Sequence, residues 1–179
     1  GQGVEYIFPH EDHYYQVRYR PVQMAPRQEP LMAFYVQDVT NHEELRNTYQ
    51  QSRTVLLYIQ IDNYDEVMQG QTEAERTSLL LAVNRALNKW LKNLGGFMRR
   101  VSDDLYVVIL TRDALDQAIN ERFDILDKVR QLQSTNRLPV TLSMGVAVAE
   151  NQTMAELGAQ AQAGLDLALG RGGDQVAVQ

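Results

Sequence analysis

The order of strands and helices after Thr54 constrains the fold of this chain more than any other feature of its sequence. The predicted segments are a buried strand at 54–62, a long helix at 73–94, hairpin arms at 97–101 and 105–110, a second helix at 113–133 and a strand at 139–148. This β-α-β-β-α-β order is that of the split β-α-β motif, a sheet with its helices on one face. A third helix and a short strand at 175–178 follow, so we expect an α+β, ferredoxin-like fold.

Apolar spacing and end signals define the three helices. The long helix ends at Gly95-Gly96, the third begins with a capping box formed by Thr153 and Glu156, and "GRGGD" at 170–174 ends it. The residues expected on the buried sides are Leu80, Val83, Leu87, Trp90, Leu91 and Leu94 in the first helix, Leu115, Ile119, Leu126 and Val129 in the second, and Leu157, Ala161, Leu165 and Ala168 in the third.

The first 53 residues have a different pattern. Residues 14–22 and 31–39 alternate as strands do, and the stretch between them contains two Pro and is predicted to be a hairpin loop. Two strands do not make a stable domain alone. Residues 41–53 predict a polar connecting helix, with Thr40 or Asn41 as its N-cap.

Composition excludes several classes of protein. The 179 residues are 44% hydrophobic, which is enough for one core or for one domain plus a fragment, and the net charge of −6 argues against a nucleic-acid partner. The chain has no Cys, and no apolar run reaches the length of a membrane span. His10 and His13 are interpreted as part of a solvated loop, because no third metal ligand is evident. The chain begins at Gly1 and ends in a predicted strand, so we expect a piece of a longer protein.

Four stretches carry a resemblance to a known family. They are "LLYIQIDNYDEV" at 56–67, "RRVSDDLYVVIL" at 99–110, "VTLSMGVAV" at 140–148 and "GLDLALGRGGDQVAV" at 164–178. In this order and spacing, residues 54–179 resemble a GGDEF domain, the nucleotidyl cyclase palm fold of diguanylate cyclases. The resemblance implies a site at the end of the first strand, against the hairpin turn, where two divalent cations would be held by carboxylates.

Several positions depart from the pattern of an active cyclase. The first metal-binding Asp of the family is Gln60, a poor ligand for a hard cation. The Gly-Gly-Asp-Glu positions fall on Ser102, Asp103, Asp104 and Leu105, so the third-position carboxylate is kept and the fourth is lost. The positions that read guanine in the family align with Met68 and Thr77, those that clamp phosphate align with Leu169 and Gly173, and the inhibitory Arg-x-x-Asp site is absent from 93–96. We therefore predict a degenerate domain without diguanylate cyclase activity.

The form of the degeneracy resembles one group in particular. "QIDNYDEV", "RRVSDDLY" and "LDLALGRGGDQVAV" are similar to the GGDEF module of GdpP-type proteins, membrane-anchored cyclic di-AMP phosphodiesterases of Gram-positive bacteria. The resemblance implies that residues 1–40 are the C-terminal fragment of a PAS domain, that 41–53 are a linker helix and that 54–179 are the degenerate GGDEF domain. It also implies partners within the same protein, namely the rest of the PAS domain and an Asp-His-His hydrolase module that uses Mn²⁺. The chain would then lie on the cytosolic face of a membrane to which its parent protein is anchored.

Five residues are candidates for a residual nucleotide site. Asp62 and Asp104 are the candidate metal ligands, with Asn63, Arg100 and Arg171 as further contacts, Arg171 replacing the lost phosphate clamp. Each candidate also has a structural interpretation. Asp62 and Asp104 are of a residue type that is common in turns, and Arg99 and Arg100 alternate along a strand, so at most one of them faces the cleft. The "GRGGD" segment is either an anion-binding nest or a helix-ending turn.

Two function classes follow, besides a plain spacer. The first is a regulatory module, with homodimerisation as one route, that requires no cofactor in this chain. The second is a weak ATP-binding or ATP-hydrolysing domain that uses Mg²⁺ or Mn²⁺.

Overall fold

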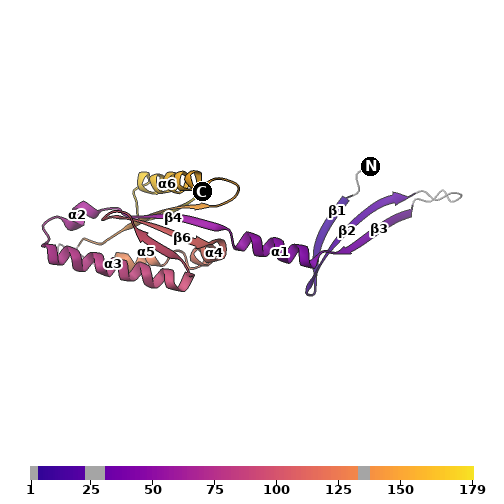
Figure 1. Cartoon of the computed structure of the whole chain (residues 1–179), viewed down its shortest axis with the longest axis horizontal. Coiled ribbons are helices and arrows are strands. Elements are labelled where there is room, and N and C mark those ends of the chain that lie inside the picture. The colour runs from indigo at the N-terminus through magenta and orange to yellow at the C-terminus, as the bar shows by residue number, and fades with distance from the viewer. Residues whose placement is uncertain (1–3, 23–30, 133–137) are drawn as a thin grey trace. The chain divides into compact units, whose positions relative to one another are not determined.

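The computed structural model describes residues 4–22, 31–132 and 138–179. The chain divides into two compact units, Gly1–Gln50 and Gln51–Gln179, and each is described by itself. Figure 1 shows the elements of both units along the chain.

The first unit is an antiparallel sheet in the order β1-β2-β3, followed by a helix. Its elements are β1 (Val4–His10), β2 (His13–Val22), β3 (Leu31–Asp38) and α1 (Thr40–Gln51). The strands predicted at 14–22 and 31–39 are present, whereas β1 was not predicted, and the predicted loop at 23–30 lies outside the described residues. His10 and His13 pair at the ends of β1 and β2, so they belong to strands and not to a loop. Asp38 takes the capping role predicted for Thr40 or Asn41, since its Oδ1 accepts the Thr40 amide at 2.9 Å.

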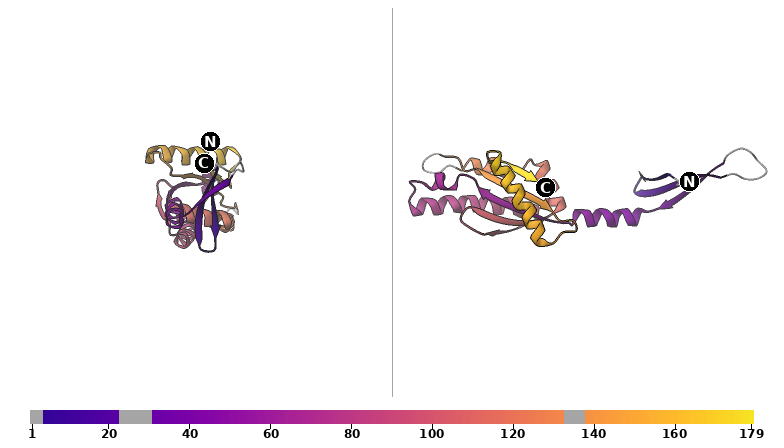
Figure 2. Two further views of the ribbon diagram at one scale, coloured as in Figure 1. Left: turned by 90° about the vertical axis from the view of Figure 1, so that its right-hand side faces the viewer. Right: turned by 90° about the horizontal axis from the view of Figure 1, so that it is seen from above.

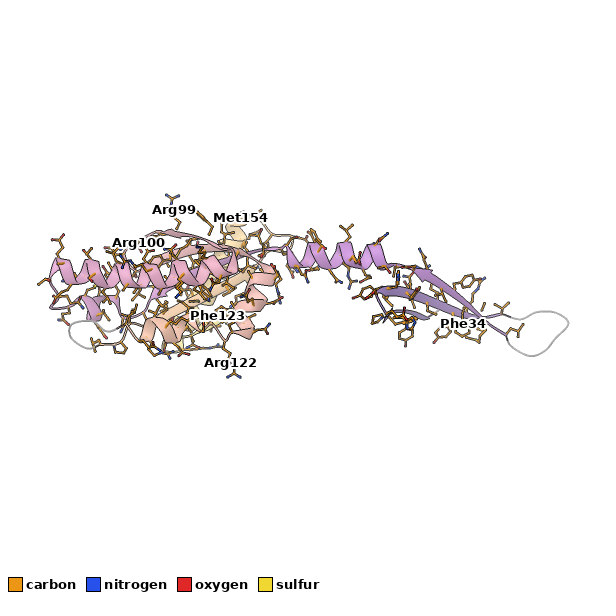
Figure 3. All side chains as sticks on the ribbon, turned by 90° about the horizontal axis from the view of Figure 1, so that it is seen from below. Phe34, Arg99, Arg100, Arg122, Phe123 and Met154 are labelled. Atoms are coloured by element: carbon orange, nitrogen blue, oxygen red, sulfur yellow. The ribbon has the colours of Figure 1, made fainter. Side chains whose placement is uncertain are left out.

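One face of this small sheet is apolar and uncovered within the unit. Register places Tyr6 beside Val17, Val17 beside Val36 and Tyr19 beside Phe34. No described strand residue of the unit is buried, and Phe34 is 63% exposed (Figure 3). The described residues of the first unit therefore do not enclose a core.

The second unit has the predicted topology. Its elements are β4 (Thr54–Ile61), α2 (Tyr64–Met68), α3 (Glu73–Leu94), β5 (Phe97–Arg100), β6 (Leu105–Thr111), α4 (Arg112–Asn120), α5 (Ile125–Arg130), β7 (Leu142–Val148), α6 (Met154–Gly170) and β8 (Val176–Val178). The sheet order is β5-β6-β4-β7-β8, in which β8 is parallel to β7 and the other neighbours are antiparallel. The first four strands have the order of the split β-α-β motif, and β8 extends the sheet beside β7.

Helices cover both faces of this sheet, α3 to α5 on one side and α6 on the other (Figures 1 and 2). Alternation along β4 explains the two layers, because Val55, Leu57 and Ile59 enter the larger core while Leu56 packs with Leu157 of α6. The expectation that the helices lie on one face of the sheet is correct for the predicted β-α-β-β-α-β segment. The later helix α6 covers the opposite face.

The long helix α3 begins and ends as expected. Thr72 and Glu75 form its capping box, and Gly95 adopts the left-handed conformation at its C-cap. Its buried residues are Leu79, Val83, Leu87, Trp90, Leu91 and Leu94. Leu79 therefore takes the place predicted for Leu80, which is only partly buried.

The second predicted helix, at 113–133, is wrong as a single helix. It is two helices, α4 and α5, because Arg122 and Phe123 have positive φ values of 53° and 48°. The Phe123 amide donates to the Ala118 carbonyl at 2.8 Å, which closes α4. This reversal buries Phe123 beside Trp90, with ring centroids 6.4 Å apart, and turns Ile119 outward to 42% exposure. Arg122 projects from the surface (Figure 3).

The third helix, α6, packs unusually close to the sheet. Its capping box of Thr153 and Glu156 is confirmed, as is the burial of Leu157, Ala161, Leu165 and Ala168. A Cβ atom on Gly145 of β7 would lie 2.1 Å from the Ala161 carbonyl oxygen, so only glycine permits this approach. Of the helices in the described residues, none combines the length and the apolar character needed to cross a bilayer.

Candidate functional site

A small cleft of about 320 Å³ lies at the end of β4, where the chain enters α2. Gln60, Asp62, Asn63 and Asp104 are among the residues that line it, together with Asp65 and Glu66. Three of the five predicted site residues therefore share one cleft: Asp62, Asn63 and Asp104. The lining carries no Lys or Arg, so the cleft is acidic.

The Asp104 carboxylate is already bound within the protein. Its Oδ2 accepts a hydrogen bond from the Gln60 amide at 2.9 Å, and its Oδ1 accepts one from the Ser102 hydroxyl at 2.7 Å. Gln60 comes from β4 and Ser102 from the turn between β5 and β6, and the Asp104 carbonyl also accepts the Ile61 amide at 2.9 Å. Gln60 and Ser102, which both depart from the GGDEF pattern, thus bind Asp104, the carboxylate of that pattern that remains. Asp104 is half-buried in this network and is not an exposed turn residue.

The Asp62 carboxylate has a partner from the far end of the chain. Its Oδ2 accepts the backbone N–H of Asp174 at 2.8 Å, and its Oδ1 is buried without a hydrogen-bond partner among the described residues. A Cβ on Gly173, whose φ is +75°, would lie 2.9 Å from Asp62 Oδ2. Asp62 thus fixes the segment that joins α6 to β8, a role that the sequence did not indicate.

The "GRGGD" segment is a helix-ending turn. The amides of Gly172 and Gly173 donate to the carbonyls of Leu169 and Ala168, at 3.0 and 3.1 Å. The amide of Asp174 is used by Asp62, and the Asp174 carboxylate pairs with Arg130 at 2.9 Å. Since these three amides are engaged, the turn does not offer the converging N–H groups of an anion nest.

Two other candidates lie outside the lining of the cleft. Arg171, at the C-cap of α6, is exposed. Arg100 donates to the carbonyls of Ser102 and Asp103 and to the Asp103 carboxylate, so it braces the hairpin turn. In the register of β5 and β6, Arg100 lies opposite Tyr106, whose side chain enters the larger core. Gln60 faces the α6 side of the sheet, so Arg100 and Gln60 lie on opposite faces.

Asn63 has a structural role as well. Its Nδ2 donates to the Pro139 carbonyl at 2.9 Å, and its Oδ1 accepts from the Thr141 amide at 3.4 Å. These bonds fasten the end of β4 to the segment that leads into β7. Both polar groups of the Asn63 side chain are therefore engaged within the protein.

The donor set fits a divalent cation poorly. Mg²⁺ and Mn²⁺ prefer several oxygen ligands, but the described residues contain no cluster of three or more His, Cys, Asp and Glu side chains arranged to hold a metal. Both candidate carboxylates accept internal hydrogen bonds, and the amide of Gln60 presents its N–H₂ group to Asp104. A cation here would have to share the Asp104 oxygens with these donors, and of the oxygens of the two candidate carboxylates only Asp62 Oδ1 has no hydrogen-bond partner among the described residues.

Tyr64, which lines the cleft, and Tyr106, which is buried in the larger core, both stay neutral near neutral pH. Burial, with a further contribution from the Asp103 charge, raises the pKa of Tyr64, and burial raises the pKa of Tyr106. The Tyr106 hydroxyl has no hydrogen-bond partner among the described residues. Neither side chain adds a negative charge to the cleft near neutral pH.

The sheet order, with a hairpin turn held against the end of the central strand, is that of a GGDEF-type domain. Solved structures agree on this fold: the active GGEEF domain of a diguanylate cyclase from Vibrio cholerae aligns with a TM-score of 0.63 at 14% identity, over 76% of this chain and 89% of that one.

The particular family follows from sequence. The chain belongs to the family described as "Cyclic-di-AMP phosphodiesterase GdpP-like, GGDEF domain", whose model matches residues 59–179. It is 41% identical over 153 residues to the cyclic-di-AMP phosphodiesterase GdpP of Geobacillus thermodenitrificans, and 42% identical over 153 residues to that of Bacillus subtilis. Each alignment covers 86% of this chain and 23% of the relative, so the chain spans about a quarter of the relatives' length.

Proposed function

We propose that this chain is a cyclase-inactive, regulatory GGDEF module of a cyclic di-AMP phosphodiesterase. The observation that carries the proposal is the engagement of both remaining carboxylates, Asp104 by Gln60 and Ser102, and Asp62 by Asp174. A cyclase needs carboxylates free to hold cations against a triphosphate. In this chain the corresponding groups stabilise the fold instead.

The rest of the parent protein is part of the same proposal. Its relatives carry the name phosphodiesterase and are more than four times the length of the matched region. We propose that residues 1–40 continue a PAS domain, that α1 links it to the GGDEF unit, and that an Asp-His-His module with Mn²⁺ performs hydrolysis elsewhere in the parent. A membrane anchor would likewise lie outside the 179 residues.

The test uses this chain alone. Purified protein incubated with GTP and Mg²⁺ or Mn²⁺ is expected to form no cyclic di-GMP, and with cyclic di-AMP and Mn²⁺ it is expected to form no cleavage product. Chromatography of the reaction mixtures measures both. Time-dependent formation of cyclic di-GMP would overturn the loss of cyclase activity, and cleavage of cyclic di-AMP would place the hydrolytic centre within these residues.

Weak metal-dependent ATP binding is the second candidate. It is favoured by one observation, that Asp62 and Asp104 still line the same cleft. Because this cleft is acidic, a triphosphate would need a bridging cation to approach it. Calorimetric titration of ATP, GTP and cyclic dinucleotides, with and without Mg²⁺ or Mn²⁺, tests this candidate directly.

A further inference from the structure

One face of the second unit is only half covered. α6 packs mainly on β7, β4 and β8, and the hairpin β5–β6 extends beyond it. Strand register puts six hairpin residues on the same face as α6, and we call them the open half: Phe97, Arg99, Val101, Leu105, Val107 and Ile109. Phe97 is 68% exposed and Val101 59%, whereas single-domain surfaces rarely leave such side chains together.

The outward side of α6 is also unlike a solvated helix. Opposite its buried residues lie Ala155, Ala159 and Ala163, all exposed. The only charged residues of this helix are Glu156 and Asp166. The exposed side of α3, by contrast, carries Arg76, Arg85, Lys89 and Lys92, as expected for a helix facing water.

We propose that a second copy of this chain covers the open half, with the outward side of its α6 lying on β5 and β6. By two-fold symmetry, α6 of the first copy covers the open half of the second, so the contact is isologous. The two α6 helices then lie side by side and parallel, between two facing sheets. This inference stands on the surface alone and does not depend on the regulatory proposal.

The dimensions of the two surfaces match. The open half is two strands wide, about 10 Å, which is about the diameter of one helix. α6 has 17 residues and is therefore about 25 Å long. One helix and one open half together give a projected contact area of roughly 500 Å² per copy. Because side chains project from both surfaces, the solvent-accessible area buried per copy is larger and comes toward the roughly 800 Å² per partner of a stable interface.

Charge and helix packing support the same occupant. Arg99, the one charged residue of the open half, projects from the ribbon (Figure 3), and both charged residues of α6 are acidic. The side of α6 nearest the hairpin bears Gly158, where an added Cβ would be 3.6 Å from the Tyr58 hydroxyl. Gln162 lies one turn further along the same side, so two parallel α6 helices can approach closely there.

The first experiment measures association of the full chain by sedimentation equilibrium. The unmodified protein is expected to be a dimer, Phe97→Asp is expected to raise the dimer Kd at least tenfold, and Leu81→Asp is expected to leave it unchanged. Leu81 is the matched control, because it is 50% exposed on α3, on the opposite face. A monomeric unmodified chain would overturn the proposal. A dimer with the same Kd after Phe97→Asp would also overturn it and would assign the association to another surface.

The second experiment uses the absence of Cys from the sequence. Gln162→Cys is expected to give a covalent dimer with a short bis-maleimide, because the two copies of this position face each other. Gln160→Cys is the control, since Gln160 lies on the other side of α6 near Val178 and Gln179. Equal cross-linking of both variants, or preferential cross-linking at Gln160→Cys, would exclude parallel α6 helices paired through the Gly158 side.

Discussion

The side-chain amide of Gln60 donates a hydrogen bond of 2.9 Å to Oδ2 of Asp104. Gln60 occupies the position where the GGDEF pattern has a metal-binding Asp, and Asp104 is the signature carboxylate that remains. Two carboxylates at this spacing would repel each other without a cation between them. The amide removes this repulsion and forms a direct bond, so the end of β4 and the hairpin turn are held together without metal.

Asp104→Asn and Asp62→Asn test the residual nucleotide site. If ATP binds in this cleft through a cation, each change is expected to weaken metal-dependent binding by about 1–3 kcal/mol, the value of one charge-assisted contact. Titration calorimetry with ATP and Mg²⁺ or Mn²⁺ measures the effect. Asp103→Asn is the control, because Asp103 pairs with Arg100 and does not line the cleft. Unchanged binding in both test variants would remove the cleft as the site.

Gly145→Ala tests the close contact between β7 and α6. An added methyl group would meet the α6 backbone at 2.1 Å, and backbone cannot rotate away as a side chain can. We expect a loss of about 3 kcal/mol or more in the free energy of unfolding, at the upper end of overpacking costs. Urea denaturation measures it. Gly170→Ala, where a Cβ meets nothing within 4 Å, is expected to be nearly neutral; equal losses in the two variants would contradict the contact.

Phe123→Ala and Ile119→Ala distinguish the broken helix from a continuous one. Phe123 is buried against Trp90, so its truncation is expected to cost about 3–5 kcal/mol. Ile119 is 42% exposed, and its truncation is expected to cost less than about 1 kcal/mol. Chemical denaturation of both variants gives the comparison. A larger cost at Ile119 would be the signature of one helix through 113–133.

Glu156 gives a pH dependence to the start of α6. Hydrogen bonds from the Thr153 amide and hydroxyl hold the pKa of the Glu156 carboxyl below its ordinary value of 4.5. A depressed folded-state pKa stabilises the fold above the unfolded pKa, and this stabilisation is lost as the pH falls through the folded pKa. Glu156→Gln should therefore be less stable than the unmodified chain at pH 6, and the difference should narrow at pH 3.5. Thermal melts at both pH values measure this, and a difference independent of pH would contradict it.

The sequence determined the local elements of the second unit and the split β-α-β order of its first six predicted elements, whereas the layer that α6 forms on the opposite face was not predicted. The buried strand at 54–62, the capping box at Thr153 and the glycines after α3 depend on neighbouring residues, so they can be predicted without knowing the fold. The weakness of Gln60 as a ligand for a hard cation is likewise a property of residue type, and the resemblance to the GGDEF pattern is what marks the position as a metal-binding one. Strand β1 was missed, as was the break at Arg122 and Phe123, where burial of Phe123 against Trp90 outweighs a nearly continuous helical pattern.

The partners of the site residues were decided only by the tertiary structure. Asp62 and Asp174 are 112 residues apart, and Gln60 and Asp104 are 44 apart. Each pair meets only because the sheet order brings the end of β4 beside the hairpin turn and beside the segment after α6. Residue type alone allows a carboxylate to bind metal, nucleotide or backbone. Which of these it does depends on the donors that folding places within about 3 Å, and in this chain those donors are an amide side chain, a hydroxyl and a backbone N–H.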